Sequence, residues 1–307
     1  MEQIYDFIII GAGPAGCFCG IELAKAGMKV CILEKHAENA RKVCGDGINA
    51  ICTEVLQRMD FPMERLTDEG AVPIMKYHIY REGALQSIDL TQEHKTVYGL
   101  PRNKTDLVFQ RYASEEHHVA IYYNTNVQDI ISTDGIYMIG NFCARRIVIA
   151  AGVYAPVMLN GIPLYPATKD RPVGVSMIVK GKKAAEPFFL FDYDASYHGT
   201  YAWIFCIGEG IYNAGIWLKE DKAAIRDKME HFMQERAAAW IGAEYEVMVP
   251  LKGALMGIGD PVASPQPGIY LIGDAANSSN PADGEGISRA IVAAKELTMQ
   301  ILNTIRS

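Results

Sequence analysis

The chain has 307 residues, half of them hydrophobic, and a formal net charge of −7 at pH 7. It is longer than one typical domain and has enough apolar residues for a sizeable core. The acidic balance excludes nucleic acid as the main partner, because binding to phosphates needs a basic surface.

The scattered cysteines, seven in number, predict reduced thiols in the cytoplasm and no metal site. No secretory signal is visible, and no apolar run reaches the roughly 18 residues of a membrane span. Peripheral contact with a membrane stays open.

The first elements form a strand–helix–strand unit of the size expected for a βαβ motif. Residues 5–10 predict a buried parallel strand, residues 14–26 a helix and residues 29–34 a second strand. Further along the chain, helices are predicted at 105–116, 223–241 and 284–305, and strands at 119–124, 146–151, 174–180, 188–193, 201–207, 211–218 and 268–272.

This pattern is α/β at both ends with a mostly β insertion between them. Because the ends must meet to complete one sheet, the sequence predicts a Rossmann-like domain that is discontinuous along the chain. We expect a dinucleotide-binding domain at 1–70, 99–160 and 260–307, and an inserted, mostly antiparallel β-sheet substrate domain at 71–98 and 161–259.

The first motif is Gly11-x-Gly13-x-x-Gly16, between the first strand and its helix. The first glycine permits the tight turn, the second lets the backbone approach a pyrophosphate, and the third lets helix pack on strand. The helix start supplies N–H groups and partial positive charge to the phosphates. Glu34, at the end of the second strand, is placed to accept a hydrogen bond from a ribose hydroxyl. The motif predicts a dinucleotide, with FAD and NAD as alternatives.

The second motif is a late strand that ends in Gly273-Asp274, followed by Gly284-Glu285-Gly286-Ile287 at the start of a long helix. Asp274 could accept a hydrogen bond from a ribityl hydroxyl. The N–H groups of the 284–287 turn suit the negative charge of a reduced isoalloxazine. This element favours FAD, since a domain that binds only NAD has no need of it.

Together with Arg102, Asp106 and the segment 146–152, these motifs resemble the flavoproteins of p-hydroxybenzoate hydroxylase type. The resemblance implies an extended FAD, with Arg102 near its phosphate or ribityl chain. Ala151-Gly152 stands where that group often has Asp-Gly. The expected cofactor contacts are Gly11, Gly13, Ala15, Gly16, Glu34, Lys35, Cys44, Gly45, Arg102, Val127, Gly273, Asp274, Gly284, Gly286 and Ile287.

Two further segments, Val43–Ile48 and Tyr201–Gly215, resemble the geranylgeranyl reductase family. The resemblance implies that the first segment lies near the flavin and that Tyr201, Trp203 and Phe205 line an apolar substrate cavity. The alternative for these aromatic residues is ordinary sheet core. Cys206 replaces a proline of the family motif, and the chain ends soon after the last flavin helix, so we expect an unsaturated substrate that is shorter or differently shaped.

The sequence thus predicts an FAD-dependent oxidoreductase that reduces carbon–carbon double bonds of an isoprenoid-like molecule. Cys44 is the candidate catalytic residue, as a proton donor or redox partner with a lowered pKa, and the alternative is a small packing residue. A flavin monooxygenase or halogenase and a non-catalytic flavin-binding redox protein are the rival functions. NAD(P)H and a ferredoxin-like carrier protein remain alternative electron donors.

Overall fold

A computed structural model of the chain describes residues 4–153, 157–164, 171–219 and 221–306. Parts of the predicted domains, at residues 1–3, 154–156, 165–170, 220 and 307, lie outside this description. The chain divides into two compact units. The first unit comprises Met1–Ala40, Asp106–Asp170 and Gly257–Ser307, and the second comprises Arg41–Thr105 and Arg171–Met256. Residues 41–70 and 99–105, predicted to be part of the dinucleotide-binding domain, fall in the second unit.

The first unit is built on a sheet of nine strands within the described residues, in the order β13-β12-β9-β10-β11-β1-β2-β8, with β19 paired to β11. These strands are β1 (Ile4–Ile10), β2 (Val30–Leu33), β8 (Ala120–Tyr122), β9 (Asp129–Thr133), β10 (Ile136–Ile139), β11 (Phe142–Ile149), β12 (Met158–Leu159), β13 (Ile162–Pro163) and β19 (Ile269–Leu271). β1 pairs in parallel with β2 and β11, and β19 pairs in parallel with β11. The late strand therefore joins the sheet begun by the first, as the discontinuous domain requires.

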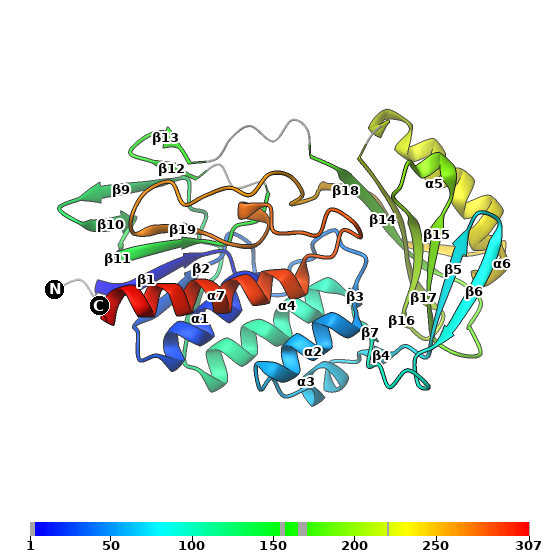
Figure 1. Ribbon diagram of the computed structural model, residues 1–307, viewed down its shortest axis with the longest axis horizontal. Helices are drawn as coiled ribbons and strands as arrows, with labels where there is room; N and C mark the ends of the chain where they lie inside the picture. Colours follow the sequence, from blue (N-terminus) through cyan, green and yellow to red (C-terminus); the bar gives the residue numbers. More distant parts are fainter. Residues whose placement is uncertain (1–3, 154–156, 165–170, 220, 307) are drawn as a thin grey trace. The chain divides into compact units, whose positions relative to one another are not determined.

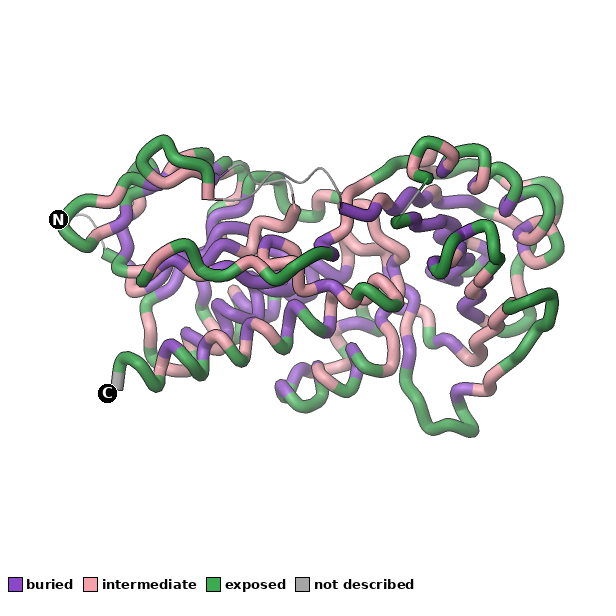
Figure 2. The backbone as a smooth tube through the Cα atoms, turned by 45° about the horizontal axis from the view of Figure 1, so that its top comes forward, coloured by how far each residue is buried: buried purple, intermediate pink, exposed green. Residues whose placement is uncertain are grey.

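Burial on both faces explains why β1 is almost continuously apolar. Phe7, Ile8 and Ile9 have no exposed surface, and Figure 2 shows the buried stretches concentrated along the strands of this unit. Helices α1 (Pro14–Lys25) and α7 (Ile287–Arg306) pack against each other (Figure 1).

The second unit contains a seven-stranded sheet in the order β18-β14-β17-β16-β15-β5-β6. Its pairings are antiparallel except for β15 with β5, which are parallel. The strands are β5 (Lys76–Arg81), β6 (Ala84–Asp89), β14 (Val173–Lys180), β15 (Phe188–Tyr193), β16 (Ala202–Gly208), β17 (Ile211–Leu218) and β18 (Glu246–Leu255). The mostly antiparallel insertion predicted from the sequence is confirmed.

Shorter elements complete this unit. They are β3 (Gly47–Ile48), α2 (Ala50–Arg58), α3 (Glu64–Asp68), β4 (Val72–Pro73), β7 (Tyr98–Gly99), α5 (Ile225–Phe232) and α6 (Ala238–Ile241). Helix α4 (Arg102–Arg111) spans the boundary at Thr105–Asp106. The helix predicted at 223–241 is instead α5 and α6 joined by a π-helical stretch, Met233–Ala237.

The sequence reading did not include the β9–β10 hairpin or β18. The hairpin turn is Asp134-Gly135, where both residues have positive φ (51° and 77°), as a two-residue type I′ turn requires. Pro250 lies within β18, which can carry a residue without an N–H because it is an edge strand.

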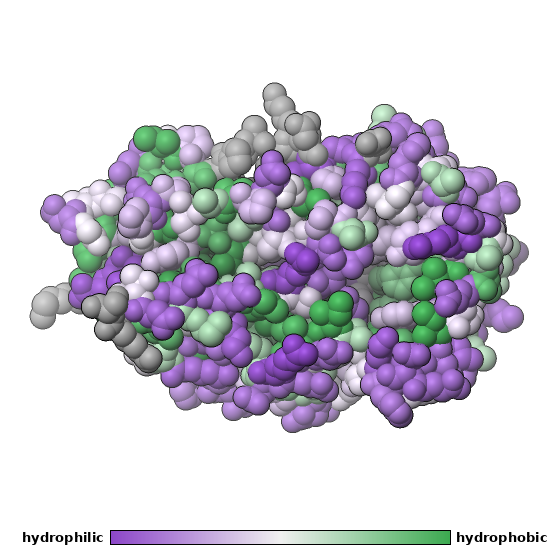
Figure 3. Space-filling view, in the orientation of Figure 1, coloured by the Kyte–Doolittle hydropathy of each residue, from purple (hydrophilic) through white to green (hydrophobic). Residues whose placement is uncertain are grey.

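None of the described helices is both long and apolar enough to cross a membrane. On the face drawn in Figure 3, hydrophilic residues predominate, with smaller hydrophobic areas between them.

Candidate functional site

The glycine loop of the first unit is packed too tightly for side chains at two of its glycines. Gly11 has a φ of +103°, and a Cβ built on it would lie 2.5 Å from the carbonyl oxygen of Ala150. A Cβ on Gly16 would lie 1.9 Å from the carbonyl oxygen of Gly11. The loop therefore turns directly against the end of β11 and the start of α1, which is the arrangement that the sequence motif predicted.

The start of α1 has the chemistry of an anion site. Gly13 is the residue that precedes the helix, and no described side chain caps the helix start. Pro14 occupies the first turn, and that turn carries no acidic residue. The N–H groups at this end thus face no competing carboxylate of their own turn, which fits a pyrophosphate at the helix start.

Glu34 is buried at the end of β2, with 4% of its surface exposed. Its Oε2 accepts the N–H of Ala12 at 2.8 Å, and its Oε1 accepts the N–H of His36 at 3.0 Å. A carboxylate has about four acceptor positions, so Glu34 fixes the glycine loop and keeps capacity for a ribose hydroxyl.

The turn after β19 packs on the glycine loop. Gly273 has a φ of +64°, and a Cβ there would lie 3.0 Å from the Cβ of Ala15. Asp274 accepts a hydrogen bond from the hydroxyl of Ser279 at 2.7 Å. A Cβ on Gly257 would come within 2.3 Å of the same carboxylate. The two motifs predicted to form one cofactor site therefore meet within the first unit.

The start of α7 carries its own carboxylate. Glu285 accepts the N–H of Ser288 at 2.7 Å and the Ser288 hydroxyl at 2.6 Å. Gly284 has a φ of +72°, and a Cβ on Gly286 would lie 2.6 Å from the Ser279 hydroxyl oxygen. The glycine conformation of the predicted turn is therefore in place, but the N–H of Glu285 within it already donates to the Asp283 carboxylate at 3.0 Å.

These features fit FAD. Side chains are excluded at the glycine loop, the α1 start is open to an anion, and Glu34 and Asp274 present carboxylates to hydroxyl groups. Of the other predicted contacts in this unit, Lys35 is exposed just after β2. Val127 is buried in the core cluster beneath the sheet, together with Ile130 and Tyr137.

An aromatic wall covers one face of the sheet in the second unit. Trp203 lies opposite Phe191, and Phe205 lies opposite Phe189, on neighbouring strands β16 and β15. The Phe189 and Phe205 rings stack with centroids 4.1 Å apart. Trp203 and Phe205 are each 7% exposed. The members of this wall are Tyr77, Phe189, Phe191, Tyr201, Trp203 and Phe205.

The segment 44–47 lies directly on this wall. A Cβ on Gly45 would be 3.2 Å from the Phe205 ring and 3.4 Å from the indole nitrogen of Trp203, and one on Gly47 would be 2.9 Å from the Phe189 ring. The two glycines let the backbone beside Cys44 approach the rings. The two segments with family resemblance are therefore in contact within the second unit.

Cys44 is partly exposed, and its Sγ lies 3.9 Å from Nη1 of Arg102. Burial raises the pKa of the Cys44 thiol, and the Arg102 guanidinium opposes this without reversing it. The lowered pKa predicted from the sequence is therefore wrong, because desolvation of the thiolate outweighs the nearby positive charge.

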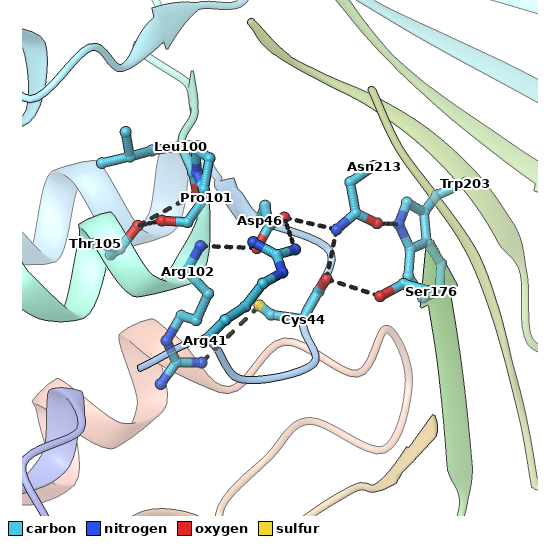
Figure 4. A network of polar contacts seen from close by, with 10 residues as sticks. All are labelled: Arg41, Cys44, Asp46, Leu100, Pro101, Arg102, Thr105, Ser176, Trp203 and Asn213. Atoms are coloured by element: carbon cyan, nitrogen blue, oxygen red, sulfur yellow. Dashed lines mark hydrogen bonds and ion pairs between the residues drawn. The ribbon is translucent and has the colours of Figure 1, made fainter. Parts of the chain in front are cut away.

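Asp46 lies at the centre of a polar network (Figure 4). It is 2% exposed and has a φ of 63°. Its carboxylate accepts Arg41 Nη2 at 2.7 Å, the Arg102 N–H at 2.8 Å and Asn213 Nδ2 at 2.7 Å. Burial raises the pKa of the Asp46 carboxyl, and Arg41 opposes the shift. With its left-handed backbone between two glycines, Asp46 shapes the turn of this segment as well as joining its polar contacts.

The seven cysteines all lie within the described residues, none of them forms a disulfide bond, and six of them are buried. The Cys206 thiol donates to the carbonyl oxygen of Gly208 at 3.3 Å. Within the part of the chain that the structure describes, no group of three or more His, Cys, Asp or Glu is arranged to hold a metal ion.

Sequence reasoning missed several residues of these sites, among them Gln110, Phe189 and Phe191. Gln110 donates to the carbonyl oxygen of Ala12 at 3.0 Å and so anchors the glycine loop. Phe189 and Phe191 extend the aromatic wall, and their alternation in a predicted strand was the signal that could have found them. Gln110 gave no local signal, because its contact is 98 residues away.

Comparisons with known proteins find similarity to flavin-binding proteins. Residues 5–135 match a family model described as an FAD binding domain. A menaquinone reductase of Mycolicibacterium smegmatis is 26% identical over 316 residues, which cover 94% of this chain and 74% of that protein. A digeranylgeranylglycerophospholipid reductase of Methanopyrus kandleri is 26% identical over 318 residues, with the same coverage of 94% and 74%.

The fold is shared with solved structures of two kinds, one named as reductase-like and one as a halogenase. A geranylgeranyl bacteriochlorophyll reductase-like protein from Thermoplasma acidophilum has a TM-score of 0.80 at 19% identity, over 98% of this chain and 80% of that one. A myxobacterial chondrochloren halogenase has a TM-score of 0.78 at 18% identity, over 98% and 76%. The fold by itself therefore does not separate a reductase from a halogenase.

Proposed function

We propose that this protein reduces carbon–carbon double bonds of an apolar, isoprenoid-like substrate, because residues 5–135 match an FAD binding domain and relatives are named as menaquinone reductase and digeranylgeranylglycerophospholipid reductase. The observation that carries this proposal is that the segment with the Cys44 thiol packs on an aromatic wall, where burial raises the pKa of the thiol.

In this proposal the first unit holds the cofactor. The N–H groups at the start of α1 bind the pyrophosphate, Glu34 binds a ribose hydroxyl, and Asp274 binds the ribityl chain. Bound FAD, once reduced, supplies a hydride. The electrons come from NAD(P)H or from a ferredoxin-like carrier, and both donors remain alternatives.

Cys44 supplies the proton in this proposal, and the aromatic wall supplies the apolar surface. With reduced FAD bound, its hydride would go to one alkene carbon and the proton of Cys44 Sγ to the neighbouring carbon, which would saturate the alkene and leave the cofactor oxidised. The raised pKa keeps the thiol protonated at neutral pH. Arg102, 3.9 Å from the sulfur, stabilises the thiolate that remains until it is reprotonated from water.

Tyr201, Trp203 and Phe205 hold the hydrocarbon in this proposal. Aromatic faces bind apolar chains and exclude water from the reacting atoms. Contact with a membrane surface would bring such a substrate within reach, and we include it as part of the proposal.

The experiment is anaerobic. The yellow protein is reduced with dithionite and mixed with polyprenyl and quinone-like alkenes, while flavin reoxidation and the saturated product are followed. We expect reoxidation by at least one alkene, and a slower reaction in Cys44→Ala. The matched control is Cys206→Ala, which removes a buried thiol bonded to its own strand end.

Other results identify the rivals. Product hydroxylation with oxygen consumption, or a chloride-dependent product, in the absence of any alkene reoxidation would overturn the reductase proposal in favour of a monooxygenase or halogenase. Flavin binding without reoxidation by any substrate would favour a non-catalytic redox protein. NADPH and reduced ferredoxin, offered separately in place of dithionite, distinguish the electron donors.

A further inference from the structure

The side chain of Asn213, on β17, joins two parts of the second unit that the sequence treats separately. It has no exposed surface. Its Nδ2 donates to the carbonyl oxygen of Cys44 and to Oδ2 of Asp46, both at 2.7 Å. Its Oδ1 accepts the indole N–H of Trp203 at 2.8 Å. Figure 4 shows the amide between the Cys44–Asp46 segment and the Trp203 ring.

The partners fix which way the amide faces. The Cys44 carbonyl and the Asp46 carboxylate are acceptors, whereas the Trp203 indole nitrogen is only a donor. A flipped amide would oppose oxygen to oxygen at two contacts and N–H to N–H at the third. The same amide therefore ties the thiol segment and the indole together in one arrangement.

The opposite side of the Cys44–Asp46 segment is also held. Arg41 and the Arg102 N–H bind the Asp46 carboxylate, and the Asp46 carbonyl oxygen accepts the N–H of Leu100 at 2.9 Å. Asn213 is the contact on the sheet side, with a weaker one from the Ser176 hydroxyl to the Cys44 carbonyl at 3.4 Å. Loss of Asn213 would leave the segment fixed on one side and loose on the side that faces the aromatic wall.

We infer that Asn213 is a positioning residue that sets the place of the Cys44 thiol and the plane of the Trp203 ring as one unit. The consequence of this positioning for catalysis rests on the proposed function. Asn213 would hold the Cys44 proton donor at a fixed position relative to the aromatic wall that orients the substrate. The geometric part stands without any substrate, so it can be tested separately.

The test measures the reactivity of Cys44 in the FAD-loaded protein. Iodoacetamide labels thiolates, and mass spectrometry of peptides gives the rate at each cysteine as a function of pH. Cys44 is the partly exposed cysteine, and the other six are buried, so they report on general opening of the fold.

In Asn213→Leu we expect at least a tenfold faster labelling of Cys44 at neutral pH, with a pH midpoint shifted down, because the released segment lets water reach the thiol. The six buried cysteines stay unlabelled. Ser176→Ala is the matched control, since it removes only the longer bond to the same carbonyl, and we expect less than a threefold change.

Trp203→Phe provides a second variant that keeps an aromatic ring. It removes the donor to Asn213 Oδ1, and we expect a smaller, selective acceleration at Cys44. Combining it with Asn213→Leu removes both ends of that bond and the unsatisfied indole N–H. We expect the double variant to be more stable than Asn213→Leu alone but to keep the fast labelling.

An unchanged Cys44 rate and pH profile in both single variants would overturn the inference. Equal acceleration at all seven cysteines would also overturn it, because Asn213 would then support the fold in general. If the alkene panel fails with the wild-type protein while labelling behaves as expected, the proposed function is wrong and the positioning role stands. If the wild-type protein reduces an alkene of the panel and the labelling behaves as expected, Asn213→Leu should lower kcat more than it raises KM.

Discussion

Gly16 shows at the scale of one residue how the cofactor loop depends on the absence of a side chain. The Cβ position of Gly16 is 1.9 Å from the Gly11 carbonyl oxygen, so even alanine requires the backbone to move. Gly27, after the same helix, has a positive φ of +79° but no atom within 4 Å of its Cβ position. A side chain at Gly16 would therefore clash with the backbone, whereas a side chain at Gly27 would only strain its own backbone conformation.

We predict that Gly16→Ala loses most of its FAD, with affinity reduced by about tenfold or more, which corresponds to about 1.4 kcal/mol. Flavin absorbance per protein after gel filtration measures the loss. Gly27→Ala should keep its flavin and lose only about 1 kcal/mol of stability from its left-handed backbone. Equal flavin content in the two variants would contradict a tight glycine loop.

The Cys44 thiol gives a prediction about pH. Burial raises its pKa above the ordinary value of 9.0, so the protonated donor persists through neutral pH and is lost only as pH rises through the raised pKa. The rate of alkene reduction should be flat around neutral pH and fall in the alkaline range. Cys44→Ala should lack this fall and be slower by about a hundredfold, as expected for loss of a general acid.

Stopped-flow flavin reoxidation across a pH series measures this profile. A wild-type rate that already falls near neutral pH would mean that the thiol pKa is not raised. An alanine variant with the wild-type profile would show that another group donates the proton.

At the scale of elements, helix α7 begins with a side chain that serves its own N-terminus. Glu285 binds both the N–H and the hydroxyl of Ser288, and its negative charge also suits the helix dipole. The same stretch was predicted to offer its N–H groups to the flavin. Ser288 lies just after that turn, so the Glu285 side chain serves the helix, whereas within the turn the Glu285 N–H is bonded to Asp283.

We predict that Glu285→Ala lowers the free energy of unfolding by about 1 kcal/mol, as loss of a helix cap does. Urea unfolding followed by far-ultraviolet circular dichroism measures the change. Glu296→Ala, an exposed position in the middle of α7, is the matched control and should change stability by less than about 0.5 kcal/mol. Equal effects at both positions would refute the capping role.

At the scale of the whole molecule, the chain passes between the two units at residues 40–41, 105–106, 170–171 and 256–257. Neither unit is a continuous piece of sequence, so we expect them to unfold together. All three tryptophans, Trp203, Trp217 and Trp240, belong to the second unit, whereas the glycine loop belongs to the first. Tryptophan fluorescence therefore reports on the unit that does not carry this loop.

We predict that FAD at about a hundred times its dissociation constant raises the free energy of unfolding seen by tryptophan by about 2.7 kcal/mol. Riboflavin, which lacks the pyrophosphate that the glycine loop is proposed to bind, should give a much smaller shift. An unfolding transition, followed by tryptophan fluorescence, that does not change when FAD is added would show that the units unfold separately. Equal shifts with riboflavin would contradict the pyrophosphate site.

The sequence alone determined the fold class and the resemblance to geranylgeranyl reductases, and both are confirmed. It could do so because the signals are local: a strand, a glycine turn and a helix follow one another within residues 5–16. The βαβ unit and the late Gly273-Asp274 strand were predicted for the same reason. The roles of the site residues, the electron donor and the substrate remain predictions.

Only the tertiary structure decided the surroundings of Cys44. Asn213 is 169 residues away from it in the chain, and Ser176 is 132 residues away, so no spacing rule could join them. The direction of the thiol pKa depended on how much water the fold removes from the sulfur, which outweighed the guanidinium beside it. Local pattern thus predicted where a cofactor loop begins, while long-range packing set the chemistry of the thiol.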